Sequence, residues 1–181
     1  YGSGEAGIAN AKQLQGKELS YNNLVDLDAA WQLVCEFREP ASAIIKHTNP
    51  CGCAVAATLA ESYRKAFEAD PVSAFGGVLA FNREVDAETA AEIAKTFIEA
   101  VAAPAYTAQA QSILAAKKNL RLLEVAPGAL DTPVLKSISG GYLVQSADHK
   151  PLRREDAQVV TEAKPTEEQW AALEFAWRVV K

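Results

Sequence analysis

The chain has 181 residues, 49% hydrophobic and 23% charged, which is the composition of a globular protein with one domain or two small ones. Its 18 basic and 23 acidic residues give a net charge of −5, which argues against a non-specific nucleic-acid binder, and no apolar run approaches the roughly 20 residues of a membrane-spanning helix. The opening YGSGEAGIAN lacks the features of a signal peptide, and three cysteines, an odd number, favour a reducing cytoplasm over a disulfide framework.

Hydrophobic periodicity and turn residues predict that helices and strands alternate along the chain. In chain order, the patterns predict a helix at 24–38, a strand at 41–47, a turn at 49–52, a helix at 58–70, a strand at 73–82, a helix at 86–97, a strand at 98–106, a helix at 107–119, a strand at 120–125, a hairpin at 135–148 and a helix at 166–180. Such alternation predicts an α/β layer fold with a largely parallel sheet, which the closing hairpin would make mixed.

Three helix starts carry capping signals. Thr58 and Glu61 have the spacing of a capping box, as do Thr166 and Gln169, and Asp86 is the expected N-cap of its helix. The last helix reaches the end of the chain without Gly, Asn or Pro. We therefore expect the chain to be cut from a longer protein, with residues 1–20 forming a loop at the cut.

The stretch AIIKHTNPCG, residues 43–52, contains the strongest chemical signal, because Lys46 and His47 follow an apolar strand and precede a bend. Ligands of open α/β sheets bind outside the carboxyl ends of the strands, which is where we expect this pair to lie. An imidazole can take or give a proton near neutral pH, and a neighbouring ammonium favours its neutral form. An acid–base site competes with the plainer interpretation of a packed histidine beside a surface lysine.

A zinc site is the other alternative, because Cys51 and Cys53 follow His47 closely. A zinc deaminase needs His-x-Glu and Pro-Cys-x-x-Cys, whereas here His47 is followed by Thr-Asn and the cysteines are separated by one residue. A structural zinc site needs four ligands, and no fourth lies nearby. The sequence therefore favours a site without metal.

Other candidate positions each have a structural explanation. The glycine pair of SAFGG, residues 73–77, allows close approach of a ligand or marks a bend. Glu99 lies in an apolar run and binds a substrate amine or simply faces outward, and Asn23 is explained as an N-cap. The basic AAKKNLR, residues 115–121, is interpreted as a solvated helix end.

Taken together, GKELSYNNLVDLDAAW, IIKHTNPCG, DPVSAFGGVLAFNREVDAETA, AAKKNLRLLEV and GGYLVQSAD resemble, in this order, the family of bifunctional purine biosynthesis enzymes that combine AICAR formyltransferase with IMP cyclohydrolase. AICAR is 5-aminoimidazole-4-carboxamide ribonucleotide. The resemblance extends from about residue 11 to the end. It implies a cytidine deaminase-like three-layer α/β/α fold with a mixed sheet, residues 21–181 being the first of two such halves of the formyltransferase region.

The resemblance also implies the reaction and the partners. A formyl group would pass from 10-formyltetrahydrofolate, the co-substrate, to the 5-amino group of AICAR, without a metal. The family implies a homodimer in the cytoplasm that binds neither nucleic acid nor membrane. His47 matches the proton-accepting histidine, and Lys46 matches the lysine that stabilises the transition state. Substrate-binding positions of the family match four further residues: Asn23, Phe75, Gly76 and Glu99.

Departures from the family pattern limit the expected activity. The Arg-Tyr-Gly-Glu-Asn-Pro-His-Gln stretch that helps to hold the AICAR phosphate is absent, as are the folate-binding half and the cyclohydrolase domain. We therefore expect that the 181-residue chain does not catalyse formyl transfer alone. A zinc-dependent deaminase-type hydrolase and a non-catalytic α/β interaction module, packing through its apolar last helix, remain the alternatives.

Overall fold

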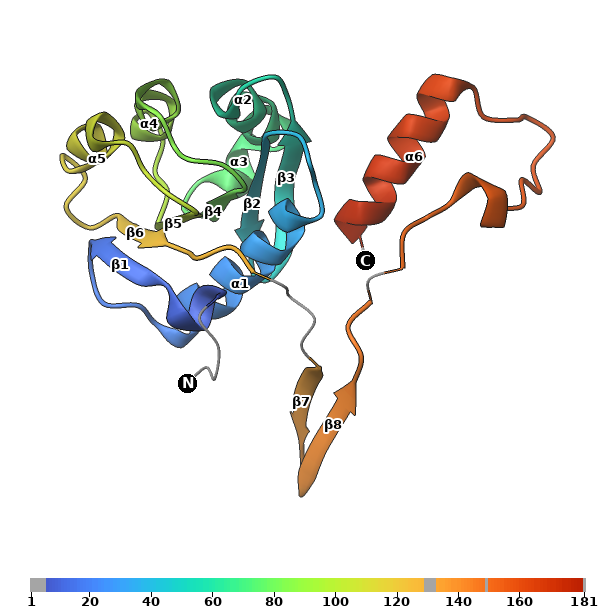
Figure 1. Cartoon of the computed structure of the whole chain (residues 1–181), viewed down its shortest axis with the longest axis horizontal. Coiled ribbons are helices and arrows are strands. Elements are labelled where there is room, and N and C mark those ends of the chain that lie inside the picture. The colour runs from blue at the N-terminus through green and yellow to red at the C-terminus, as the bar shows by residue number, and fades with distance from the viewer. Residues whose placement is uncertain (1–5, 129–132, 149, 181) are drawn as a thin grey trace. The chain divides into compact units, whose positions relative to one another are not determined.

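A mixed six-stranded sheet forms the centre of the first part of the chain (Figure 1). The computed structural model describes residues 6–128, 133–148 and 150–180. The strand order is β1-β6-β5-β4-β2-β3, in which β4, β5 and β6 are parallel neighbours and the remaining pairings are antiparallel. The strands of this sheet are β1 (Lys12–Gln15), β2 (Ala41–Lys46), β3 (Asn49–Val55), β4 (Val78–Phe81), β5 (Ala100–Ala103) and β6 (Arg121–Glu124).

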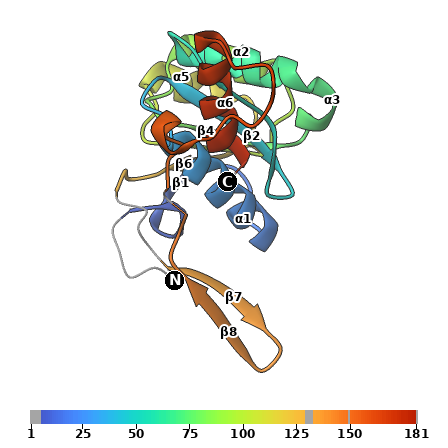
Figure 2. The same ribbon diagram turned by 90° about the vertical axis from the view of Figure 1, so that its right-hand side faces the viewer.

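Helices cover both faces of this sheet, which gives three layers (Figure 1, Figure 2). One face carries α1 (Tyr21–Cys35), which packs on β2, β4 and β5. The other face carries α2 (Leu59–Ala69), α4 (Ala87–Ala94) and α5 (Ala108–Leu114), and the short α3 (Pro71–Ala74) precedes β4. The expected α/β/α fold with a mixed sheet is confirmed.

The core follows from the two-residue period of the strands. In β5, Val101 and Ala103 belong to the cluster beneath α2, α4 and α5, whereas Ala100 and Ala102, also buried, alternate with them. Every residue of β4 and β5 is buried, as expected for strands covered on both faces. The continuous apolar runs of these strands therefore encode their central position.

The helix starts confirm most of the capping signals. Thr58 and Asp86 each accept a hydrogen bond from the backbone three residues on, at the starts of α2 and α4. The interpretation of Asn23 as an N-cap is wrong, because α1 starts at Tyr21 and Ser20 caps it. The Asn23 Oδ1 instead accepts from the Ser20 backbone amide, at 3.2 Å, which completes a capping box inside the helix.

Three other expectations differ from the structure. Residues 12–15, expected in a loop, form β1, which pairs with β6; residues 1–5 of that segment lie outside the described residues. The Asn-Pro-Cys-Gly stretch starts β3 rather than forming the turn. Pro50 is tolerated there because β3 is an edge strand. The closing hairpin does not join the large sheet, which is mixed because of β1, β2 and β3.

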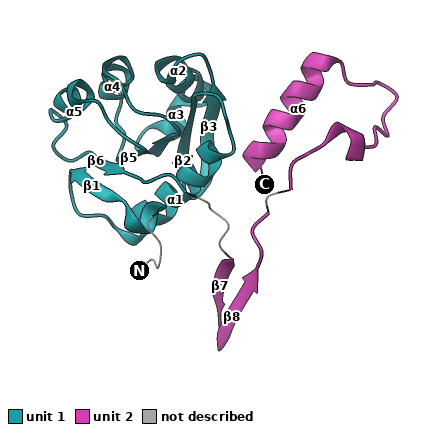
Figure 3. Cartoon of the chain, viewed as in Figure 1, with its two compact units in different colours: residues 1–129 teal, residues 130–181 magenta. Residues whose placement is uncertain are grey.

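Residues 130–181 form a separate compact unit (Figure 3). It contains the predicted hairpin of β7 (Val134–Ile138) and β8 (Gly141–Gln145), a short 3-10 turn and the predicted helix α6 (Glu167–Val180). The capping box of Thr166 and Gln169 is present. None of the described residues of this unit is buried. Over the described parts of the chain, no helix combines the length and the apolar character needed to cross a bilayer.

Candidate active site

His47 lies in a tight turn between β2 and β3. Lys46 pairs with Asn49, so His47 and Thr48 alone form the turn, with φ of 55° and 62°. Left-handed conformations at both positions are typical of type I′ turns, which favour Asn and Gly, and a β-branched residue there is strained. The Thr48 amide donates to Asp26 Oδ1 at 2.8 Å, and Asn49 Nδ2 donates to the His47 carbonyl at 2.7 Å. These contacts hold the strained turn in place.

Lys46 links this turn to the Ser-Ala-Phe-Gly-Gly segment. Its ammonium Nζ donates to the Phe75 carbonyl at 3.1 Å. The chain then reverses at Gly76, whose φ is 75° and whose amide donates to the Phe97 carbonyl at 2.8 Å. The Phe75 and Phe97 rings are in contact, with centroids 5.2 Å apart. Gly76 therefore permits a backbone conformation that residues with a side chain rarely adopt, and Lys46 is held beside this turn.

Glu99 meets Asn23 on the far side of the Gly-Gly turn. The Asn23 Nδ2 donates to Glu99 Oε2 at 3.1 Å, and the Glu99 amide donates to the Gly77 carbonyl at 3.0 Å. Asn23 is buried and Glu99 is half-buried. The asparagine thus has both amide atoms committed, its oxygen to the helix cap and its nitrogen to the carboxylate.

A continuous set of contacts connects all six sequence-predicted positions. Asn23 and Asp26 lie one helical turn apart on α1; the first contacts Glu99 and the second holds the turn of His47. Lys46 donates a hydrogen bond to the Phe75 carbonyl, and the Gly76 amide donates one to Phe97, two residues before Glu99. The positions are nevertheless divided between two hollows. One of about 310 Å³ is lined by Lys46 and His47, and a larger one is lined by Glu99.

Lys46 and His47 lie at the carboxyl end of their own strand, as expected, but this end meets the amino ends of the parallel strands. Gly76 precedes β4 and Glu99 precedes β5, so both lie at the amino ends of these strands. Lys46 ends β2, which runs antiparallel to β4, and the carboxyl end of β2 therefore meets the amino end of β4. The orientation of β2 decides which edge of the sheet carries the candidate site.

The hollow around His47 is lined by an imidazole, one ammonium, one thiol and one carboxylate. Cys51 lines it with His47, whereas Cys53 does not. Burial raises the pKa of the Cys51 thiol, which Lys46 opposes, and burial raises the pKa of Cys53 to about 12, so both thiols are protonated at neutral pH. Within 6–128, 133–148 and 150–180, no three His, Cys, Asp or Glu residues gather as a metal site.

Sequence reasoning missed three residues around this hollow. Asp26 holds the turn, and its three-residue spacing from Asn23 on a predicted helix was the available signal. Asp70 and Ser73 line the hollow, and hydrogen bonds from Ser73 hold the pKa of the Asp70 carboxyl below its ordinary value. The His47 imidazole is exposed and forms no hydrogen bond with the described residues. Its ring is therefore available to a ligand.

Comparison with known proteins gives consistent matches over the whole chain. The family model of the AICARFT/IMPCHase bienzyme matches residues 1–181. The chain is similar to the bifunctional purine biosynthesis protein PurH of Nostoc punctiforme, with 53% identity over 99% of the chain and 35% of that protein. The corresponding protein of Anoxybacillus flavithermus is 54% identical over 96% of the chain and 34% of its own length.

A third relative, the bifunctional purine biosynthesis protein PurH of Synechocystis sp., is 55% identical over 97% of the chain and 35% of its own length. The chain thus spans about a third of the length of the curated relatives that it matches. The family model covers every residue, including the turn of His47 and the segments of Gly76 and Glu99. The chain therefore belongs to the AICARFT/IMPCHase bienzyme family.

Proposed function

We propose that the chain serves de novo purine biosynthesis as part of a bienzyme, in its AICAR formyltransferase activity. The formyl group moves from 10-formyltetrahydrofolate to the 5-amino group of AICAR, and IMP cyclohydrolase is the second activity of the whole bienzyme. Residues 21–181 are the first deaminase-like half of the formyltransferase region. The observation that carries this proposal is the contact set that joins the turn of Lys46 and His47 to Gly76, Glu99 and Asn23 in a member of this family.

His47 is the proposed base. The amine of AICAR is conjugated to the imidazole carboxamide and must lose a proton as its nitrogen bonds to the formyl carbon. The bond from that carbon to the folate nitrogen breaks, and this nitrogen takes up a proton. An exposed imidazole with no competing hydrogen bond suits proton acceptance. Its strained turn is consistent with a functional position, because such strain concentrates at active sites.

Lys46 is the proposed electrostatic partner. One proton of its ammonium is donated to the Phe75 carbonyl, which fixes the group next to the turn. An ammonium has three donors, so two remain to stabilise charge that develops on the formyl oxygen and to protonate the leaving nitrogen. The hydrogen bond from Lys46 to the Phe75 carbonyl is already present, so positioning the ammonium requires no reorganisation during the reaction.

The substrate-binding roles fall on the segments next to this pair. Phe75 exposes 61% of its surface and offers a ring face, while Gly76 leaves its turn unobstructed by a side chain. Glu99, oriented by Asn23, offers a carboxylate to a substrate donor. The remaining parts of the proposal are a homodimer, a cytoplasmic location and the absence of a metal, nucleic-acid or membrane partner.

Replacement of His47 tests the proposal, and the φ of 55° determines the variants. Ala removes the imidazole but disfavours the left-handed conformation, whereas Asn removes the imidazole and tolerates that conformation. In the whole bienzyme, both His47→Ala and His47→Asn should lower kcat for formyl transfer by about two to four orders of magnitude, the usual effect of a positioned acid–base group. Steady-state assays with AICAR and 10-formyltetrahydrofolate measure this loss.

The cyclohydrolase activity of the same preparation is the internal control and should stay unchanged. A loss below about tenfold for His47→Asn would show that the imidazole does not carry the proton, since a positioned acid–base group contributes more. A large loss for His47→Ala alone would assign the effect to the conformation of the turn instead of the ring.

A further inference from the structure

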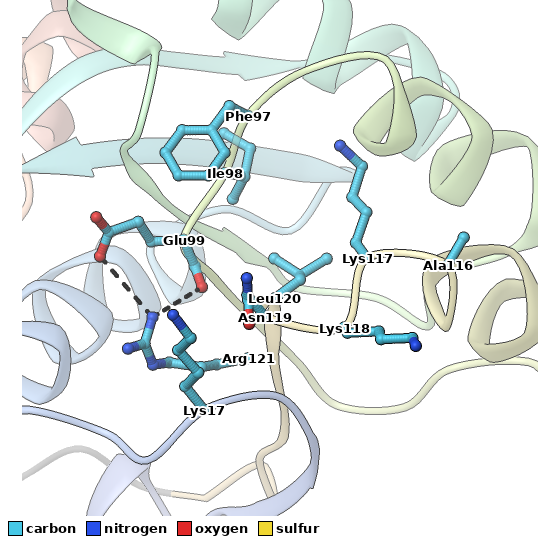
Figure 4. A pocket seen from close by; sticks show the side chains of 10 residues that line it. All are labelled: Lys17, Phe97, Ile98, Glu99, Ala116, Lys117, Lys118, Asn119, Leu120 and Arg121. Atoms are coloured by element: carbon cyan, nitrogen blue, oxygen red, sulfur yellow. Dashed lines mark hydrogen bonds and ion pairs between the residues drawn. The ribbon is translucent and has the colours of Figure 1, made fainter.

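The larger hollow, of about 570 Å³, lies between three loop segments (Figure 4). Phe97–Glu99 enters β5, residues 116–121 join α5 to β6, and Lys17 follows β1. These segments are far apart in sequence and meet at the amino ends of two parallel strands. We call this hollow the basic pocket because lysine and arginine side chains line it.

Four cations line the basic pocket, against one carboxylate. The cations are Lys17, Lys117, Lys118 and Arg121, and the carboxylate is Glu99. The chain as a whole has a net charge of −5, so this concentration of positive charge is local. Basic clusters in a concave site raise the local concentration of anions.

The interpretation of residues 115–121 as a solvated helix end fits Lys117 and Lys118, which follow α5, but Lys17 follows β1 and Arg121 lies in β6. α5 ends at Leu114, and the carbonyls of Leu114 and Leu120 accept hydrogen bonds from Gln15 Nε2, both at 3.2 Å. Lys117 Nζ donates to the Thr96 carbonyl at 2.6 Å, outside the helix. The end of α5 is therefore satisfied by Gln15 and by backbone amides, and it does not need the cations as hydrogen-bond donors.

The pocket is fixed by contacts that do not depend on a ligand. Arg121 exposes only 15% of its side chain, and its Nε donates to the Glu18 carbonyl at 3.0 Å. Gly16, with φ of 97°, lies so close to β6 that an added Cβ would be 2.3 Å from the Leu120 carbonyl oxygen. Only glycine permits this approach, which holds the Lys17 segment beside Arg121.

Positive charge exceeds negative charge in the basic pocket. In Figure 4, the side chains of Lys17 and Arg121 both extend toward Glu99, whereas Lys118 extends away from them. The Arg121 guanidinium is 3.9 Å from the Glu99 carboxylate, which already accepts a hydrogen bond from Asn23. Lys17 has no ion-pair partner within the described ranges. One shared carboxylate therefore faces two cations.

We infer that the basic pocket binds the dianion of a phosphate monoester or of free phosphate, through Lys17 and Arg121. A guanidinium matches the oxygens of phosphate and an ammonium adds a compact charge beside it. The volume exceeds that of phosphate alone, and the Phe97 ring, 50% exposed, lines the same pocket and offers a flat apolar face to a nucleoside. This inference does not depend on formyl transfer.

Titration of the 181-residue chain with inorganic phosphate at low salt tests the inference. Two-dimensional amide NMR should show saturable shifts at Lys17 and at 119–121, with a Kd on the order of 1 mM. AICAR and its riboside, which lacks the phosphate, separate the two sources. Binding of AICAR at least about tenfold tighter than inorganic phosphate, with no shift from the riboside, assigns the site to a nucleotide phosphate. Equal affinities assign it to free phosphate.

Lys17 and Lys118 form a matched pair, since both are exposed lysines of the same pocket. Lys17→Ala should weaken phosphate binding about fivefold, in the range of one lost charge-assisted hydrogen bond at a solvated site. Lys118→Ala should weaken it less than about twofold, because its side chain extends away. His47→Asn should leave phosphate binding unchanged, so that a failure of the formyl-transfer proposal stays distinguishable.

Three results would overturn the inference. The first is the absence of saturable shifts at these amides at about 20 mM phosphate, well above the expected Kd. The second is an equal effect of Lys17→Ala and Lys118→Ala, and the third is equal shifts with chloride at matched ionic strength. Either of these would show general attraction of anions instead of a site.

Discussion

The two hairpins β2–β3 and β7–β8 turn through two residues each, by different means. The first uses His47 and Thr48, both left-handed and neither a glycine, and contacts from α1 and from Asn49 hold it. The second uses Ser139 and Gly140, with a left-handed φ of 81° at the glycine alone. A Cβ at Gly140 or Gly141 would meet nothing within 4 Å. The first turn is strained and supported, and the second is relaxed and open.

This difference shows which of the two hairpins tolerates backbone strain. Left-handed residues other than glycine cost about 1–2 kcal/mol each and persist only where surrounding contacts determine them. β3 packs on α2 and β2 is buried, so the first hairpin has such support. β7 and β8 have no buried residue. The supported strain coincides with the proposed base, which is the expected relation between strain and function.

Matched glycine substitutions should give the largest contrast between the hairpins. A Cβ at Gly52 of β3 would be 1.9 Å from the Ala66 carbonyl oxygen of α2, so Gly52→Ala must push the helix from the sheet. We expect a loss of about 3 kcal/mol in the free energy of unfolding, at the upper end for overpacking. Gly141→Ala should change it by less than about 0.5 kcal/mol. Urea unfolding followed by circular dichroism measures both; similar values would mean that α2 does not restrain β3.

Removal of the support from α1 should give the next largest effect. Asp26→Ala deletes the acceptor of the Thr48 amide, so the turn loses a fixed position and His47 with it. We expect kcat for formyl transfer by the whole bienzyme to fall about tenfold, because small displacements of a reacting group are costly. Asp26→Asn keeps an oxygen that can accept the same bond and should retain most of the activity.

Asp28→Ala is the control for Asp26, since Asp28 lies on the same helix and accepts only from Gln32 in the described contacts. It should leave formyl transfer unchanged. If Asp26→Asn were as impaired as Asp26→Ala, the charge of Asp26 and not its hydrogen bond to the turn would matter. Unimpaired Asp26→Ala would show that the turn needs no support from α1.

The same contrast explains what the sequence could predict. The hairpin around Gly140 was predicted correctly because a glycine marks its left-handed position. The turn at His47 and Thr48 was missed because neither residue signals that conformation, while Asn-Pro-Cys-Gly imitates a turn. In the structure, Ile44 pairs with Gly52 and Ile45 with Pro50, so Cys51 is the extra residue of a bulge in β3. The Asn-Pro-Cys-Gly pattern does not distinguish such a bulge from a turn, so it predicted the wrong element.

The candidate residues could be named before the structure was known, but their arrangement in space could not. Lys46, Gly76 and Glu99 lie at strand ends or entries, and the family resemblance singled them out as candidates. The edge of the sheet on which they meet depends on the antiparallel β2, and no local pattern gives strand direction. Asp26 is part of the arrangement only through a hydrogen bond to a turn 22 residues away. Long-range contacts of this kind decide how a named set of residues becomes a site.

The smallest expected effects have opposite signs in the two hairpins. Thr48→Asn places a residue that tolerates φ of 62° in the first turn and should raise the free energy of unfolding by about 0.5–1 kcal/mol, since strain is relieved. Gly140→Ala forces a side chain to φ of 81° and should lower it by about 1 kcal/mol. Both are read from urea unfolding of the 181-residue chain. If Thr48→Asn were also destabilising, Thr48 would have to be favoured by its own contacts, and the first turn would hold no strain for α1 to support.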